Sequence, residues 1–130
     1  MNPNYAEAYC NLANTLQDLG KLEEAEASFR QAINFALDPT EAYYRLGVLL
    51  FYFGRLEESI ESFEAASDKL SQTYILKPLF ALDRRGEFFD QLDHLTKRGE
   101  VNAIVGSYTS RAAIKYGVKK RNIFAENAFE

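Results

Sequence analysis

The stretch AEAYCNLANTLQDLGKLEEAEASFRQAI, residues 6–33, returns later in the chain as EAYYRLGVLLFYFGRLEESIESFEAA, residues 41–66. The copies align without a gap at a period of 34, so residues 6–39 and 40–73 are two repeats of one pattern. Aromatic, leucine, glycine and alanine positions recur between them. They are Tyr9, Leu12, Ala13, Leu16, Leu19, Gly20, Leu22, Ala25, Phe29 and Ala32, matched by Tyr43, Leu46, Gly47, Leu50, Phe53, Gly54, Leu56, Ser59, Phe63 and Ala66. A period of this length is typical of stacked helical hairpins.

Apolar residues within each repeat recur at i, i+3 or i+4, which predicts amphipathic α-helices. Gly20 and Gly54 interrupt these stripes at equivalent places, where a residue that tolerates positive φ lets a helix end and the chain reverse. Asp38-Pro39 separates the repeats, because the residue before a proline is pushed out of the α region. We therefore predict helices over residues 6–19, 22–36, 40–53 and 56–70.

Each predicted hairpin contains a small residue opposite a large one. Ala13 and Gly47 lie on the first helices, and Phe29 and Phe63 lie on the second helices. A small side chain lets the two helices approach closely, and the phenylalanine fills the space beside it.

The pattern becomes irregular after residue 70. We predict a helix over residues 72–85, with Lys77-Pro78 tolerated near its first turn or as a kink, and a second after Gly86 that ends at Gly99. Residues 74–99 would then be a degenerate third repeat, which fits the divergent terminal unit expected of such arrays. A further helix over residues 101–116, ended by Gly117, would act as a cap, and residues 100–130 would comprise this cap and a tail. The whole chain, residues 1–130, is predicted to be a single all-α domain.

Composition excludes several classes of protein. The 47% hydrophobic and 14% aromatic content is too high for a disordered chain. No apolar run reaches the roughly 18 residues that a membrane span requires, and the N-terminus does not resemble a signal peptide. The lone Cys10 makes no internal disulfide. We expect a cytoplasmic protein without membrane contact.

The net charge of −4 is unevenly distributed. Residues 1–68 contain 12 acidic and 4 basic residues, a balance of −8, whereas residues 69–130 contain 7 acidic and 11 basic residues, a balance of +4. Solvated helix faces explain such a pattern, and two modules with different partners are the alternative.

The two copies resemble the tetratricopeptide repeat (TPR) family over residues 3–70. The shared features are an aromatic residue, Leu-Gly or Leu-Ala three residues later, a glycine that ends the first helix, and Ala, Phe and Ala on the second. The resemblance implies a right-handed superhelix of two regular hairpins and one degenerate hairpin, with a C-terminal capping helix. It also implies a protein-protein interaction module that binds a peptide or protein segment in its concave groove.

The resemblance assigns groove positions to the first helix of each repeat. They are Glu7, Cys10, Asn11, Asn14, Gln17 and Asp18 in one repeat, and Glu41, Tyr44, Arg45, Val48, Phe51 and Tyr52 in the other. Asn11 and Asn14 would hold a peptide backbone, because an amide both donates and accepts hydrogen bonds. Ordinary exposed helix residues are the alternative. The aromatic residues would select side chains, or would be covered by later helices.

Two further resemblances connect the chain with larger enzymes. The string AYCNLAN is similar to the groove of the transferase that attaches N-acetylglucosamine to proteins. The stretch from Gly99 to Glu130 resembles a connector in bacterial TPR proteins that can precede an iron and 2-oxoglutarate oxygenase domain. An accessory region of such an enzyme, with the catalytic domain outside this chain, is therefore the alternative function. A clamp for a C-terminal carboxylate is disfavoured, because Cys10 stands where its lysine would be.

The sequence offers no catalytic residues, metal ligands or cofactor site, so we do not expect an enzyme. His94 is the only histidine, and glycine-rich phosphate loops are missing. The basic cluster formed by Arg111, Lys115 and residues 119–121 is too weak an electrostatic signal to favour nucleic acid. Self-association is left open.

Overall fold

The computed structural model describes residues 3–100 and 102–117, and these residues form α-helices and turns without a β-strand. The chain divides into two compact units, the N-terminal unit over residues 1–71 and the C-terminal unit over residues 72–130. The all-α prediction is therefore confirmed, whereas a single domain over residues 1–130 stays a prediction.

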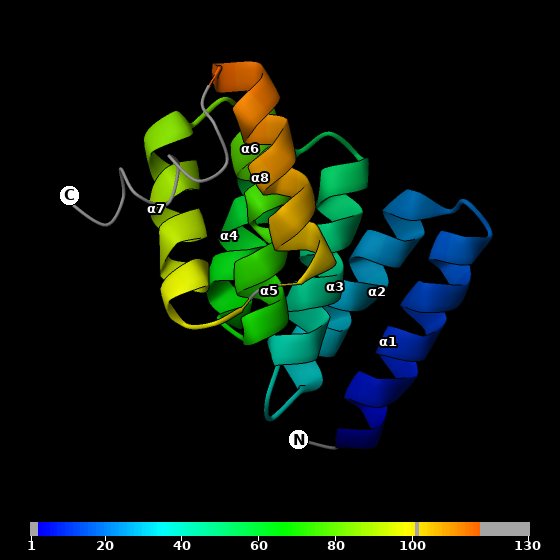
Figure 1. Cartoon of the computed structure of the whole chain (residues 1–130). Coiled ribbons are helices and arrows are strands. Elements are labelled where there is room, and N and C mark those ends of the chain that lie inside the picture. The colour runs from blue at the N-terminus through cyan, green and yellow to red at the C-terminus, as the bar shows by residue number, and fades with distance from the viewer. Residues whose placement is uncertain (1–2, 101, 118–130) are drawn as a thin grey trace. The chain divides into compact units, whose positions relative to one another are not determined.

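The N-terminal unit contains the two repeats as consecutive helical hairpins (Figure 1). Its helices are α1 (Pro3–Asp18), α2 (Leu22–Phe35), α3 (Thr40–Tyr52) and α4 (Leu56–Ala66). Three of the four predicted helices agree within a few residues. The fourth was predicted to reach residue 70 but ends at Ala66, because Ser67 adopts a left-handed conformation with φ of 59°. Extensive packing in this unit joins α1 to α2, α2 to α3, and α3 to α4.

The turn inside each hairpin has the same geometry. Gly20 and Gly54 have φ of +78° and +80°, as their glycine identity predicted. After each glycine, a backbone N–H returns to the preceding helix: Lys21 N donates to the Leu16 carbonyl, and Arg55 N donates to the Leu50 carbonyl. This pattern satisfies carbonyl groups that would otherwise lack partners at a helix end.

The core of the N-terminal unit lies where the two hairpins meet. Its fully buried residues come from α1, α2 and α3, and they are Ala13, Ala25, Phe29, Leu46, Leu49 and Leu50. At the second hairpin, a β-carbon added to Gly47 would lie 2.7 Å from the Phe63 ring. The Ser59 hydroxyl donates to the Gly47 carbonyl at 2.6 Å, which also requires close approach. The predicted role of Gly47 opposite Phe63 is therefore confirmed.

The helix predicted over residues 72–85 is divided in two. α5 (Lys69–Tyr74) crosses the boundary between the units, and α6 (Leu76–Ala81) follows after Ile75. The break places Pro78 in the first turn of α6, where its missing N–H costs no helical hydrogen bond. Two short helices thus replace the single helix that the apolar pattern suggested.

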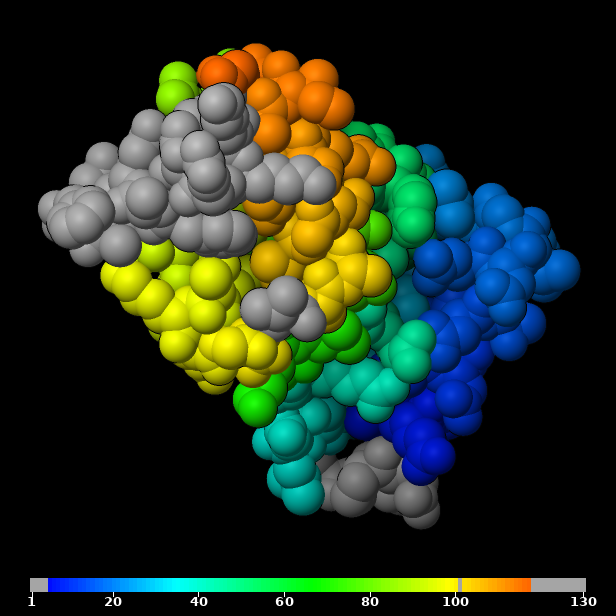
Figure 2. Space-filling view, in the orientation of Figure 1, coloured from blue at the N-terminus to red at the C-terminus, as the bar shows by residue number. Residues whose placement is uncertain are grey.

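The C-terminal unit continues with α7 (Arg85–Lys97) and α8 (Ala103–Tyr116). As predicted, Gly99 and Gly117 follow these helices with positive φ. The Asn102 side chain caps α8 by accepting from the N–H groups of residues 104 and 105. α8 packs against both α6 and α7, and part of it is visible at the surface, in gold to orange, in Figure 2.

The turn between α6 and α7 repeats the geometry of the earlier hairpins without a glycine. Arg84 N donates to the Leu79 carbonyl, five residues earlier, just as Lys21 N and Arg55 N each donate to the carbonyl five residues earlier. The backbone angles at Arg84, φ −81° and ψ 73°, match those at Lys21, φ −87° and ψ 70°. Asp83 takes the glycine position with φ of 58°. This hairpin is the degenerate one of the predicted architecture.

In the described part of the chain, every helix is too short or too polar to cross a membrane.

Candidate functional site

A hollow of about 360 Å³ lies between α1 and α3 in the N-terminal unit. α1 contributes one face of its first three turns, α3 contributes its first two turns, and the end of α2 with the following loop closes the hollow. Its lining residues are Ala6, Glu7, Cys10, Asn11, Asn14, Ala32, Ala36, Asp38, Glu41, Ala42 and Arg45. The helical spacing of these positions explains their common face, since residues three and four apart are neighbours.

Six of the twelve groove positions assigned from sequence line this hollow. They are Glu7, Cys10, Asn11, Asn14, Glu41 and Arg45. The other six lie outside it, and they are Gln17, Asp18, Tyr44, Val48, Phe51 and Tyr52. Five of these follow the lining residues toward the C-terminal ends of α1 and α3, whereas Tyr44 directly precedes Arg45. The structure thus brings together four positions of the first set and two of the second.

The predicted aromatic group is divided. Tyr44 is half-buried, and its ring lies 6.1 Å from that of Phe63. Phe51 is also half-buried and contacts Tyr52 edge to face at 5.9 Å. Only Tyr52 is largely exposed, with 67% of its surface accessible. The three residues therefore do not form one continuous exposed aromatic patch.

Arg45 connects the two helices across the hollow. Its Nε donates to Glu41 Oε1 at 2.9 Å, and its Nη1 donates to Asn14 Oδ1 at 3.4 Å. The second bond is long and therefore weak. The arrangement directs the Asn14 oxygen toward α3 and leaves the Asn14 Nδ2 group to donate elsewhere.

Asn11 is exposed at the rim. Among the described residues its side-chain amide has no hydrogen-bond partner, although its backbone carbonyl accepts from the Thr15 hydroxyl at 3.1 Å. An exposed amide is free to pair with a peptide group of a bound segment, since it offers both a donor and an acceptor.

The Cys10 thiol at the hollow is protonated at neutral pH. Partial burial raises its pKa, and the negative charge of Glu41 raises it further, although Arg45 acts in the opposite direction. Since the thiolate is the nucleophilic form, Cys10 is not activated for covalent chemistry.

Asp38 lines the hollow but was considered in the sequence only as part of the boundary between repeats. Its Oδ1 accepts from the Thr40 N–H at 3.1 Å and from the Thr40 hydroxyl at 2.6 Å, which organises the start of α3. These hydrogen bonds lower the pKa of Asp38, so its carboxylate stays charged. An Asp just before a helix often accepts hydrogen bonds from the first residues of that helix. The sequence could therefore have identified Asp38 as the residue that organises the start of α3.

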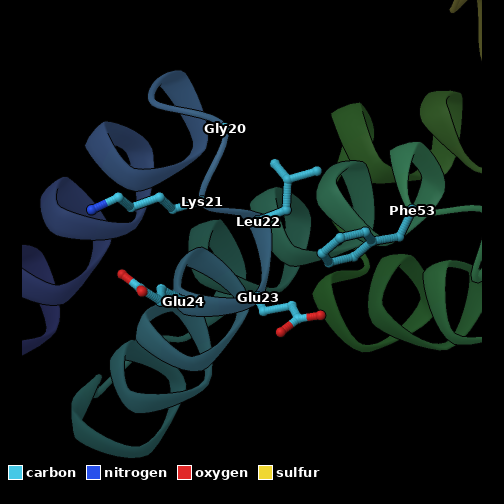
Figure 3. A pocket seen from close by; sticks show the side chains of 6 residues that line it. All are labelled: Gly20, Lys21, Leu22, Glu23, Glu24 and Phe53. Atoms are coloured by element: carbon cyan, nitrogen blue, oxygen red, sulfur yellow. The ribbon is translucent and has the colours of Figure 1, made fainter.

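A second hollow, of about 380 Å³, lies beside the turn of the first hairpin and was not predicted from the sequence. It is lined by Gly20, Lys21, Leu22, Glu23, Glu24 and Phe53. Figure 3 shows the Phe53 ring turned toward Leu22, while Lys21 and Glu24 point away. Leu22 and Phe53 also pack against the core, so their main role is to stabilise the fold.

The basic residues of α8 have local partners. Arg111 lies over the Tyr108 ring at 4.9 Å, and Lys115 lies over Phe80 at 4.6 Å and pairs with Asp83 at 3.3 Å. Residues 119–121, the rest of the basic cluster, lie outside the described residues.

Among the described residues, no three His, Cys, Asp or Glu side chains gather closely enough to hold a metal ion. His94 is exposed in the last turn of α7, and its Nε2 lies 3.4 Å from the Arg98 guanidinium.

Comparison with known protein families identifies both repeats. A family model described as tetratricopeptide repeat matches residues 6–39 and 40–68. No curated protein matches the chain significantly.

Proposed function

Because the chain belongs to the tetratricopeptide repeat family through residues 6–39 and 40–68, we propose that its N-terminal unit binds a partner protein through an extended segment held between α1 and α3. Repeats of this family generally serve as protein-protein interaction modules. The proposal adds the place of binding and the residues that hold the segment.

The observation that carries the proposal is the hollow itself. Two helices from successive repeats supply its walls, and six positions assigned to a groove from sequence line it together. Its size suits part of a peptide. The hollow therefore offers a segment both contact area and hydrogen-bonding groups.

Asn11 and Asn14 hold the backbone of the bound segment in this proposal. The Asn11 amide lies exposed at the rim, and the Asn14 oxygen is directed to Arg45, which leaves Nδ2 as a donor for a peptide carbonyl. Backbone pairing of this kind gives affinity without reading sequence, so specificity must come from neighbouring side chains. Arg45, Tyr44, Phe51 and Tyr52 are proposed to supply it.

The test is a comparison of binding by the wild type and by the Asn11→Ala/Asn14→Ala double variant. A partner isolated by affinity capture from the native cell is titrated calorimetrically against both proteins. We expect affinity to fall by about tenfold, because each lost hydrogen bond contributes roughly 0.5–1.5 kcal/mol. The melting temperature should stay within a few degrees, since neither amide is buried in the core.

The matched control is Gln31→Ala/Asn34→Ala, which removes two exposed amides from α2 outside the hollow. It should bind the partner as the wild type does. Equal affinity of all three proteins would overturn the assignment of this surface.

A further inference from the structure

The hollow carries more negative than positive charge. Its lining includes the carboxylates of Glu7, Asp38 and Glu41 but only one cationic side chain, that of Arg45. Arg45 is paired with Glu41 at 2.9 Å, so these two charges largely neutralise each other. Glu7 and Asp38 remain, and neither forms an ion pair among the described residues.

The surroundings do not compensate for these two charges. Residues 1–68 contain 12 acidic and 4 basic residues, so the potential around the hollow is negative as well. Of the four basic residues, Arg30 and Arg55 pair with Glu26 at a distance from the hollow. A cationic group that approaches the hollow would therefore be attracted by the negative charge of the whole N-terminal unit.

The apolar part of the lining is short and smooth. Four alanines contribute to it, and they are Ala6, Ala32, Ala36 and Ala42. Ala36 is half-buried and offers most of this surface, Ala6 and Ala42 are 8% and 3% exposed, and Ala32 lies fully buried beneath them. Methyl groups of this kind suit the methylene stem of a long side chain, whose charged end can reach carboxylates at the rim. Lys and Arg are the residues that combine such a stem with a positive charge.

We infer that the segment bound between α1 and α3 places a Lys or Arg side chain in this hollow, with its stem against the alanines and its cation between Glu7 and Asp38. The inference rests on the proposed function and names the chemistry of the partner. Asp38 also fits this role because Thr40 engages its Oδ1, which leaves Oδ2 for the ligand.

The experiment uses the full chain and a phage-displayed library of random peptides. Peptides are selected on the wild type, on Glu7→Gln/Asp38→Asn, and on the control Glu61→Gln/Glu64→Gln. The hollow variant removes two charges and keeps one acceptor oxygen at each position, which at Asp38→Asn can still accept from Thr40. The control removes the same charge from exposed positions of α4.

We expect selection on the wild type and on the control to enrich one Lys or Arg at a fixed position, and selection on the hollow variant to lose it. A selected peptide made synthetically should bind the hollow variant about tenfold more weakly, since charge-assisted hydrogen bonds are stronger than neutral ones. Replacing its basic residue by norleucine should weaken binding to the wild type by a similar factor. This last measurement needs no protein variant and is independent of folding.

Other outcomes separate the two proposals. Peptides without a fixed basic residue, whose binding still depends on Asn11 and Asn14, would overturn the cation inference and leave the proposed function standing. If enrichment of Lys or Arg in the selected peptides is lost equally with the hollow variant and with the control, the overall negative charge of the surface explains the enrichment. That result would also overturn the inference. Failure to enrich any peptide on the wild type would overturn the proposed function and this inference together.

Discussion

The two units of this chain are both helical but differ in how their helices contact one another. In the N-terminal unit, each helix packs extensively against its neighbours in sequence, from α1 through α4. In the C-terminal unit, α8 returns to contact both α6 and α7, so the three helices enclose a common core. A linear stack leaves helix faces open, whereas a closed cluster covers them. The hollow proposed to bind a partner lies in the linear stack.

The cores of the units reflect the same difference. In the N-terminal unit, a phenylalanine of the second helix packs on a glycine of the first, as Phe63 does on Gly47. Arg84 has the same place in its turn as Arg55 has in the second hairpin, so positions in the two hairpins can be matched from these residues. Leu92 is then the equivalent of Phe63 and Leu76 the equivalent of Gly47, and both leucines are fully buried. Phe88 replaces the small Ser59 and contributes, with Phe80 and Tyr108, to an aromatic core. The two small residues of the second hairpin thus have large equivalents in the α6–α7 hairpin, and its phenylalanine has a leucine.

The largest effect is expected from removing the C-terminal unit together with Leu70 and Ser71. Ending the chain after Lys69 should give a fragment that aggregates or melts by more than about 10 °C below the full chain, because terminal units of repeat arrays are needed to cover the last repeat. Size-exclusion chromatography and circular dichroism would measure this. A monomeric fragment that melts cooperatively near the temperature of the full chain would instead show that the linear stack is stable alone.

The next largest effect compares one repeat position in two helices. Leu12 on α1 is 47% exposed, whereas its equivalent Leu46 on α3 is 1% exposed because α2 covers it. Leu46→Ala should lower the free energy of unfolding by about 2–5 kcal/mol, and Leu12→Ala by less than about 1 kcal/mol. Urea denaturation of both variants checks the contrast. Similar losses would mean that another element covers the outer face of α1.

Two helical glycines, one in each unit, should respond to alanine with opposite signs. Gly47→Ala forces a shift of the buried Phe63 ring, so we expect a net loss of about 1–2 kcal/mol after the gain in helix propensity. Gly106 in α8 has no atom within 4 Å of an added β-carbon, so Gly106→Ala should stabilise by about 0.5–1 kcal/mol. Thermal melts of the two variants give the signs directly, and equal signs would refute the proposed difference in packing.

The smallest effect is a loss of stability in acid that both units share. Burial opposes ionisation of Glu26, but hydrogen bonds from Arg55 and Arg30 outweigh it and lower its pKa below 4.5. In the C-terminal unit, a hydrogen bond from the Tyr116 hydroxyl and then the Lys115 ammonium lower the pKa of Asp83 below 3.8. A lowered pKa means that the folded state binds its proton more weakly, so this stabilisation is complete above those values and is lost as the pH falls through the lowered pKa.

Melting temperatures measured from about pH 5 to about pH 2 would test this. Glu26→Gln and Asp83→Asn should each melt below the wild type at the upper end of the range and approach it at the lower end. Parallel curves would show that neither ion pair contributes to the pH dependence.

The sequence predicted the regular half of the fold because its determinants are local. Gly20 and Gly54 adopt positive φ and end their helices without needing distant contacts. The period of 34 shows which positions of the two hairpins are equivalent. The third hairpin was harder to predict, because Arg84 follows Arg55 by 29 residues instead of 34 and Asp83 replaces the glycine. The ends of α4 and α5 depend on Ser67 and on the break at Ile75, and neither residue carries a strong signal for ending a helix.

The candidate site shows the same limit. The resemblance to the family assigned Asn11, Asn14 and Arg45 to one groove, and all three line the hollow. It could not show that Arg45 would turn the Asn14 oxygen toward itself, or that the loop would bring Asp38 to the hollow, because both depend on three-dimensional contacts.

The one-sided packing of α1 within the described residues has a consequence for its amide hydrogen exchange. Among the described helices, α1 packs extensively against α2 alone, and its opposite face is exposed at Leu12 and Leu19. Helices held on one side open locally at lower free energy than helices held on both. Since α1 supplies one wall of the hollow, each opening would also disrupt the proposed binding surface. A segment bound between α1 and α3, as proposed, would give α1 a second neighbour, so binding should slow amide exchange along α1.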